Sequence, residues 1–336
     1  PARYRGTLST LQQVAIIFGL FSAFVSNYFL ANTAGGSTAL FWLDFETWRW
    51  MFWVELLPAC LFLIALFFIP ESPRYLIMAG KKDAAARVLS SLYGDETAAL
   101  KLNEIADSLA GDKHQPKLSD LIDKPKKRLR PIIWIGIGLA TFQQLVGINV
   151  VFYYGAVLWQ AAGFTESDAL LINIISGFVS ILAVFITMYF IDKIGRKPFL
   201  LTGSIGMTVT LSVIAYAFLN ADIGSTGNLE LGEQGIVALI AANAYVFFFN
   251  LSWGPVMWVM LGEMFPNQIR GSGLAVTGFA QWIANFLITW SFPVMLTGIG
   301  LAGAYGFYAF CAFVSVIFVF KFLHETKGKE LEQMKG

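Results

Sequence analysis

Hydrophobic residues along this chain come in long blocks, without the two- or three-residue rhythm of a half-buried strand or helix. Eight blocks are long enough to cross a bilayer as helices, since about 20 apolar residues span about 30 Å of hydrocarbon. They cover residues 7–30, 48–69, 131–159, 168–191, 199–219, 235–261, 272–296 and 301–323. A helix satisfies its own backbone hydrogen bonds within lipid. The pattern therefore predicts an all-α polytopic membrane protein.

Lysine and arginine lie almost entirely at one set of block ends. Of the 23 basic residues, 22 fall at that set, and Arg49 alone lies at the other. The loops near Arg49's side carry acids such as Glu46, Glu166 and Asp222. Because basic residues concentrate on the cytoplasmic side, we expect both termini of this chain in the cytoplasm. The location expected is the plasma membrane, or the inner membrane of a bacterial cell.

Composition narrows the choice of partners. With 57% hydrophobic and 13% charged residues, the chain has too much apolar surface for a water-soluble fold, so the lipid bilayer is its first partner. The net charge of +1 by itself says nothing about partners. We expect no nucleic-acid partner and a monomeric protein. The only histidines are His114 and His324, and no CxxC or HExxH motif occurs. We accordingly expect neither a metal nor a cofactor.

One substantial polar segment, residues 70–130, separates the second block from the third. Helical patterning around residues 84–93 and 96–109, with bases and acids mixed, predicts a small helical layer on the cytoplasmic face; an unstructured linker is the alternative. The expected organisation is then two helices in residues 1–69, this linker domain at 70–130, six helices in 131–323 and a cytoplasmic tail at 324–336.

The entries to the first and seventh blocks repeat a P-x-x-x-R-G pattern. Pro1 to Gly6 matches Pro266 to Gly271, and Glu71 after the second block parallels Glu325 after the eighth. Duplicated halves are known in secondary transporters. If the first two blocks repeat as the seventh and eighth, four helices belong before Pro1, which makes twelve in all and this chain an N-terminally truncated one.

Amides and aromatic rings are the main polar groups at membrane depth. Side-chain amides match sugar hydroxyls, and Trp faces match sugar C–H faces, whereas ionisable groups are nearly absent there. Each amide taken alone is equally explained as a contact between helices. The set comprises Gln13, Gln143, Gln144, Asn149, Gln281 and Asn285, with Tyr153, Tyr154, Trp258 and Trp282.

Two sites favour interrupted helices. On an unbroken helix, Gln143 and Asn149 point about 120° apart, so both reach one cavity most easily if the helix loosens near Gly147. Pro255, after Gly254, removes a backbone hydrogen bond and favours a kink. Interrupted helices at mid-membrane point to a transport site, although kinks without function also occur.

Charged residues cluster at the cytoplasmic block ends. A network among them would hold one state of a transporter and break in another; charges that only fix the orientation in the membrane are the alternative. The cluster includes Arg5, Glu71, Arg74, Asp192, Arg196, Glu263, Arg270 and Glu325.

An ordered series of motifs, from Pro1 to Gly336, resembles the sugar porters of the major facilitator superfamily. It looks closest to the bacterial xylose and glucose proton symporters and to facilitative glucose transporters. The series is Arg5-Gly6, Pro70-Glu71-Ser72-Pro73-Arg74, Gln143-Gln144-Leu145-Val146-Gly147-Ile148-Asn149, Asp192-Lys193-Ile194-Gly195-Arg196-Lys197, Gly254-Pro255-Val256-Met257-Trp258, Glu263-Met264-Phe265-Pro266 and Glu325-Thr326-Lys327-Gly328.

The resemblance implies a major facilitator fold of which this chain supplies helices five to twelve and an intracellular helical domain. It implies sugar-binding roles for Gln13, Gln143, Gln144, Asn149, Tyr153, Gly254, Trp258 and Gln281. It implies a cytoplasmic salt-bridge gate of Arg5, Glu71, Arg74, Asp192, Arg196, Glu263 and Arg270. Two positions depart from the family pattern: Ser180 stands where the eighth helix usually offers Asn, and His324 where Pro precedes Glu325.

The function expected is transport of a monosaccharide, a hexose or a pentose, by alternating access. The resemblance favours proton-coupled symport in the complete protein, but the coupling acid of the symporters sits on a first helix that these residues do not include. A facilitative uniporter is the alternative. A sugar sensor that does not transport is a weaker one, because only about a dozen residues follow the last block. An enzyme is not expected, since no His lies within a block.

Overall fold

The computed structural model describes residues 5–111, 118–123, 128–223, 229–230, 232 and 234–327. Within these residues, eight helical segments are long and apolar enough to cross a membrane, which confirms the predicted number. They are Thr10–Ala34, Thr47–Leu66, Pro131–Tyr153, Glu166–Ile194, Arg196–Leu219, Gln234–Met264, Gln268–Gly298 and Gly300–Phe322. Several extend a few residues past the apolar blocks because capping groups lie in the polar flanks: Thr165 accepts a hydrogen bond from the Asp168 N–H at 3.2 Å.

The chain forms two compact units. The first combines Pro1–Met51 with Lys117–Gly336, and the second is Phe52–Pro116. Helix α2 (Thr47–Trp53) runs across the boundary. All the residues of the candidate site described below belong to the first unit.

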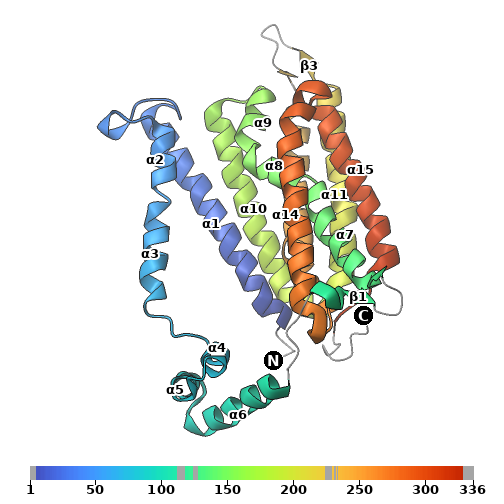
Figure 1. Ribbon diagram of the computed structural model, residues 1–336. Coiled ribbons are helices and arrows are strands. Elements are labelled where there is room, and N and C mark those ends of the chain that lie inside the picture. Colours follow the sequence, from blue (N-terminus) through green and yellow to red (C-terminus); the bar gives the residue numbers. More distant parts are fainter. Residues whose placement is uncertain are drawn as a thin grey trace. The chain divides into compact units, whose positions relative to one another are not determined.

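The first unit is a bundle of long helices, shown side by side in Figure 1. Its helices are α1 (Arg5–Ala34), α7 (Pro131–Leu145), α8 (Ile148–Tyr153), α9 (Gly155–Ala161), α10 (Glu166–Ile194), α11 (Arg196–Leu219), α12 (Gln234–Leu251), α13 (Trp253–Met264), α14 (Asn267–Gly298) and α15 (Gly300–Phe322), with short 3₁₀ turns η2 (Trp42–Asp44) and η3 (Leu118–Leu121). Helix α1 packs along α10, α11 lies between α12 and α15, and α14 packs on α7.

Two small antiparallel hairpins mark opposite ends of this bundle. Strands β1 (Ile122–Asp123) and β2 (Arg128–Leu129) pair at one end, and β3 (Asp222–Ile223) and β4 (Leu229–Glu230) pair at the other. The start of α1 and the end of α15 lie at the β1 end (Figure 1). Both ends of the bundle's spanning region thus lie on one side of it, and the assignment of that side to the cytoplasm stays a prediction.

Glycines let the central helices approach closely. A Cβ added to Gly203 on α11 would lie 1.7 Å from the Ser252 Oγ, and one on Gly206 would lie 2.3 Å from the Phe248 ring. Lipid tails are as apolar as the helices, so the hydrophobic effect does not drive helices together in a membrane. Close packing at small residues does so instead. The close contact holds α11 against the segment where α12 ends and α13 begins.

The second unit contains α3 (Leu56–Leu66), α4 (Pro73–Met78), α5 (Lys82–Tyr93) and α6 (Asp95–Gly111). The Ser72 Oγ caps α4 by accepting from the Tyr75 N–H at 3.2 Å, and Pro73 occupies the first turn, where its missing N–H costs nothing. Gly94 ends α5 with φ of +78°. Helices α5 and α6 confirm the helical patterning at residues 84–93 and 96–109, and exclude an unstructured linker there.

Candidate functional site

The third membrane span is broken at Gly147, as the angular argument predicted. Gly147 has φ of +84°, in the left-handed region that favours glycine, and separates α7 from α8. A Cβ there would lie 2.7 Å from the Tyr308 ring. The Val146 carbonyl, freed by the break, accepts a hydrogen bond from the Tyr245 Oη at 2.7 Å. The packing around Gly147 therefore fits the break, and the carbonyl that the break leaves without a helical partner is hydrogen-bonded within the protein.

The sixth span is broken between α12 and α13. Ser252 has non-helical angles, φ −130° and ψ −84°, two to three residues before the predicted Gly254-Pro255 kink. Pro255 then falls in the first turn of α13, where its lack of an N–H is harmless. The Leu251 carbonyl accepts from the Thr187 Oγ1 at 2.6 Å. Two interrupted helices thus stand side by side in one bundle, since α7 contacts α13.

Four side-chain amides form one connected hydrogen-bond network at these breaks. Asn149 Nδ2 donates to Gln144 Oε1 at 2.6 Å, and Gln144 Nε2 donates to Gln143 Oε1 at 3.2 Å. Gln281 Nε2 donates to the same Gln143 oxygen at 3.0 Å. Gln143 Nε2 in turn donates to the Trp253 carbonyl at 3.1 Å, at the start of α13. The network joins α7, α8, α13 and α14.

These amides line a cavity of about 520 Å³. One wall is α1, through Gln13, Leu20 and Ala23; the others come from α7, α8, α12, α13 and α14. The volume falls in the range of small-molecule sites, which are mostly apolar with a few convergent polar groups. Seven of the eight predicted sugar-binding residues line it: Gln13, Gln143, Gln144, Asn149, Tyr153, Gly254 and Gln281, together with Trp282 and Asn285.

Two acceptors on the cavity are buried and have no partner among the described residues. They are Gln281 Oε1 and Asn250 Oδ1, on side chains that are 7% and 0% exposed. A buried acceptor without a donor costs about 1–3 kcal/mol. The protein therefore leaves two amide oxygens beside the cavity whose hydrogen-bonding capacity the described residues do not use.

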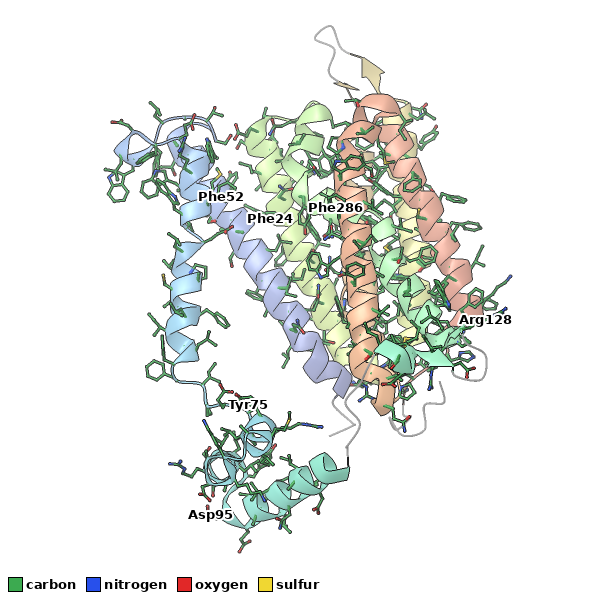
Figure 2. All side chains as sticks on the ribbon, viewed as in Figure 1. Phe24, Phe52, Tyr75, Asp95, Arg128 and Phe286 are labelled. Atoms are coloured by element: carbon green, nitrogen blue, oxygen red, sulfur yellow. The ribbon has the colours of Figure 1, made fainter. Side chains whose placement is uncertain are left out.

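Helix α1 contacts α8 next to the cavity wall. The Phe24 ring, labelled in Figure 2, lies 6.5 Å from the Phe152 ring of α8, centroid to centroid. Phe24 follows Ala23, the last α1 residue on the cavity wall. Beyond it, the Glu166 carboxylate at the start of α10 accepts from the Ser37 N–H at 2.9 Å. The loop that follows α1 thus contacts the start of α10.

Two residues named by the family resemblance lie off the cavity wall. Trp258, one turn after Gly254 on α13, is 42% exposed and is not among the lining residues. Ser180 is fully buried, donates to the Ser176 carbonyl at 2.7 Å and accepts from Asn250 Nδ2 at 3.1 Å. Ser180 is too short to reach past Asn250, which lines the cavity in its place.

Asn250 is the functional candidate that sequence reasoning missed. It lies four residues before Gly254, on the preceding helix, and both residues line the cavity. Helical periodicity would have placed positions 250 and 254 on one face. That spacing was the available signal.

A buried charge cluster lies where α10, α11 and α13 meet. Arg196 donates from Nε and Nη2 to the two Glu263 oxygens at 2.9 and 2.7 Å, and its Nη2 lies 2.9 Å from Asp192 Oδ1. Arg196 is 4% exposed and Glu263 is 6% exposed. Bidentate pairs of this kind are strong and directional. Asp192, Arg196 and Glu263, three of the seven predicted gate residues, therefore form one contact.

Glu325 extends this cluster to the tail. Its oxygens accept from the backbone N–H groups of Arg196 and Lys197, both at 2.9 Å, at the start of α11. A carboxylate at a helix N-terminus is favoured by the helix dipole and by unpaired N–H donors. Thr326 Oγ1 donates to Glu263 Oε2 at 2.7 Å. Gly195 makes the approach possible, because a Cβ there would lie 2.7 Å from Glu325 Oε2.

The other four predicted gate residues have different settings. Arg270 donates from Nε and Nη2 to the Phe265 carbonyl at 3.2 and 3.0 Å. Arg5 begins α1, and its side chain lies outside the described residues. Glu71 and Arg74 belong to the second unit. The part they play in a gate stays a prediction.

Within the described residues, no group of three His, Cys, Asp or Glu side chains is placed to hold a metal ion. The chemistry that the cavity offers is hydrogen bonding by amides and stacking by aromatic rings. Both suit reversible binding.

Comparison with known proteins gives consistent matches along the whole chain. The family model described as "Sugar (and other) transporter" matches residues 1–336. The glucose transport protein of Synechocystis sp. is 49% identical over 335 residues, covering 99% of this chain and 71% of that protein. The D-xylose-proton symporter of Escherichia coli is 37% identical, covering 100% of this chain and 65% of that protein.

Solved structures agree with these matches. The xylose transporter XylE from E. coli, in a partially occluded inward-open conformation, superposes with a TM-score of 0.78 at 36% identity, covering 98% of this chain and 66% of that one. XylE bound to 6-bromo-6-deoxy-D-glucose gives a TM-score of 0.76 at 37% identity. The chain thus spans about two thirds of the length of these relatives.

Proposed function

Because the chain belongs to the sugar transporter family of the major facilitator superfamily, we propose that it works in a permease that moves a monosaccharide, a hexose or a pentose, by alternating access. The family consists of transporters, not enzymes, as the sequence predicted. Its matched relatives include a protein that transports glucose and one that couples xylose to protons. Glucose and xylose are both small, uncharged sugars that carry several hydroxyl groups.

The observation that carries this proposal is the pair of unpartnered acceptors on an amide-lined cavity. Gln281 Oε1 and Asn250 Oδ1 have no donor among the described residues, and the amides of Asn149 and Gln13 add further polar groups to the cavity wall. A sugar hydroxyl both donates and accepts. None of the described residues that line the cavity is Asp, Glu, Lys or Arg, and an uncharged substrate suits such a lining.

The two broken helices support alternating access. In transporters, half-helices at mid-membrane line the substrate site, and the bundle opens to each side in turn around it. Here α7–α8 and α12–α13 are the broken pairs, and α1 forms the opposite wall of the cavity. We place α1 in a helix bundle that moves relative to the bundle of α7–α15. Opening would separate Phe24 from Phe152 on one side of the cavity.

We assign the cluster around Arg196 to the cytoplasmic side, with both ends of the spanning region facing the cytoplasm, following the distribution of basic residues. The Asp192, Arg196 and Glu263 contact, with Glu325, would form the fixed half of the gate. Arg5, Glu71, Arg74 and Arg270 would complete it. We propose a monomer in the plasma membrane, or in the inner membrane of a bacterial cell.

Uptake by proteoliposomes that contain the complete protein tests this function. Radiolabelled D-glucose and D-xylose should enter faster under an inward proton gradient, and a protonophore should abolish accumulation. Accumulation that resists the protonophore would exclude proton symport. Sugar equilibration without accumulation would identify a uniporter instead, and binding without any flux would identify a sensor and overturn the transport proposal.

A further inference from the structure

An apolar groove runs along the outside of the first unit between α10 and α11, away from the sugar cavity. It has a volume of about 310 Å³. Ile186, Phe190 and Ile194 line it from α10, each four residues after the last, and Pro198, Phe199 and Thr202 line it from α11. The α10 wall is therefore about 12 Å long, given the helical rise per residue.

The position of the groove along the membrane spans determines which layer of the bilayer it faces. Its walls are the last turns of one membrane span, Glu166–Ile194, and the first turns of the next, Arg196–Leu219. Ile186, Phe190 and Ile194 are 39%, 38% and 50% exposed within the chain. An apolar groove at the end of two spans opens into the outer part of the hydrocarbon layer, next to the lipid headgroups.

A cation lies beside this groove. Lys193 Nζ lies 3.4 Å from the centroid of the Tyr189 ring and 5.6 Å from that of Phe190, a groove residue. The aromatic faces hold the ammonium group by cation–π attraction at the level where α10 ends. The Lys193 side chain is exposed. A positive charge thus sits where an acyl chain in the groove would end in its headgroup.

We propose that this groove binds one acyl chain of an anionic phospholipid, with the lipid phosphate paired to Lys193. Apolar walls suit the chain, and the ammonium group favours an anionic headgroup over a zwitterionic one. Each basic residue at a membrane surface raises the affinity for anionic lipids about fivefold. The leaflet is the one at the C-terminal end of α10, which the charge pattern assigns to the cytoplasmic side.

Native mass spectrometry of the purified protein, titrated with dioleoyl phosphatidylglycerol or dioleoyl phosphatidylcholine, tests the site. The expected result is one tightly held phosphatidylglycerol and weaker binding of phosphatidylcholine with identical chains. Lys193→Gln should weaken phosphatidylglycerol binding about fivefold and leave phosphatidylcholine unchanged, while Lys193→Arg should keep the preference. Equal affinity for the two lipids in the unaltered protein would overturn the proposal.

Matched controls separate this site from general surface attraction. Lys321→Gln removes a cation from the last turn of α15, and should leave the tight lipid in place. Thr202→Trp should fill the groove and displace both lipids, whereas Ile205→Trp adds the same bulk to an exposed residue of α11 outside the groove. The proposal fails if Lys193→Gln and Lys321→Gln have the same effect, or if the two Trp variants bind lipid alike while remaining folded.

Discussion

Arg196 and Glu263 face each other through two parallel hydrogen bonds, at 2.9 and 2.7 Å. Arg196 is the first residue of α11, and Glu263 lies at the end of α13, so the pair joins two helices that have no direct connection in the chain. Asp192, at the end of α10, adds a third helix. The contact holds these ends of the three helices together.

Replacing Arg196 by Ala should destabilise the protein strongly. Loss of one partner from a buried ion pair typically costs about 3–5 kcal/mol, because the other charge stays buried without compensation. Thermal unfolding in detergent should show a clear fall in Tm. The double variant Arg196→Met, Glu263→Leu should recover much of the loss. Lys321→Ala, at an exposed site on α15, serves as the control, and an equal Tm for the two Ala variants would contradict the structural role of the pair.

Two glycines should separate sugar affinity from stability. A Cβ at Gly254 meets Asn250 Oδ1 and Gln13 Nε2 at 3.5 Å, an ordinary contact, so Gly254→Ala should fold normally while its methyl group takes room from the ligand. A Cβ at Gly203 would meet Ser252 Oγ at 1.7 Å. Gly203→Ala should therefore lower the Tm. If Gly254→Ala leaves sugar Kd unchanged, the cavity wall assigned to α13 is wrong.

Asn250 should contribute to sugar binding although Ser180, its hydrogen-bond partner, does not line the cavity. Asn250→Ala removes one acceptor, and one hydrogen bond is worth about 0.5–1.5 kcal/mol, so the Kd should rise up to about tenfold. Asn243→Ala is the matched control, because Asn243 lies two turns earlier on α12 and bonds Ser176 away from the cavity. Equal Kd values for the two variants would remove Asn250 from the site.

Much of this architecture could be predicted from the residues because lipid imposes simple rules. Apolar blocks had to be helices, and the number of spans is confirmed. The Gly147 break followed from the angle between Gln143 and Asn149, since only a change in helix direction brings both to one cavity. The helical patterning around residues 84–93 and 96–109 was also confirmed, because the periodicity of a helix is a local property of the sequence.

Other features depended on contacts between helices that local patterns do not encode. The break in the sixth span lies at Ser252, ahead of Pro255. There the Thr187 hydroxyl of α10 donates a hydrogen bond to the Leu251 carbonyl. The hydrogen bond from Asn250 to Ser180 joins two helices through residues that are 70 positions apart in the sequence. The role of Glu325 at the start of α11 joins the tail to a distant helix. Sequence spacing alone could not connect these pairs.

The central claim is that the amide-lined cavity binds a monosaccharide, and calorimetric titration of the complete protein with D-glucose and D-xylose tests it most directly. Gln144→Ala and Gln281→Ala should each raise the Kd by up to about tenfold, since each removes one hydrogen-bonding group from the cavity. Gln12→Ala, next to Gln13 but outside the cavity lining, should bind as the unaltered protein does. Unchanged Kd values for both cavity variants, in folded protein with normal Tm, would contradict the account.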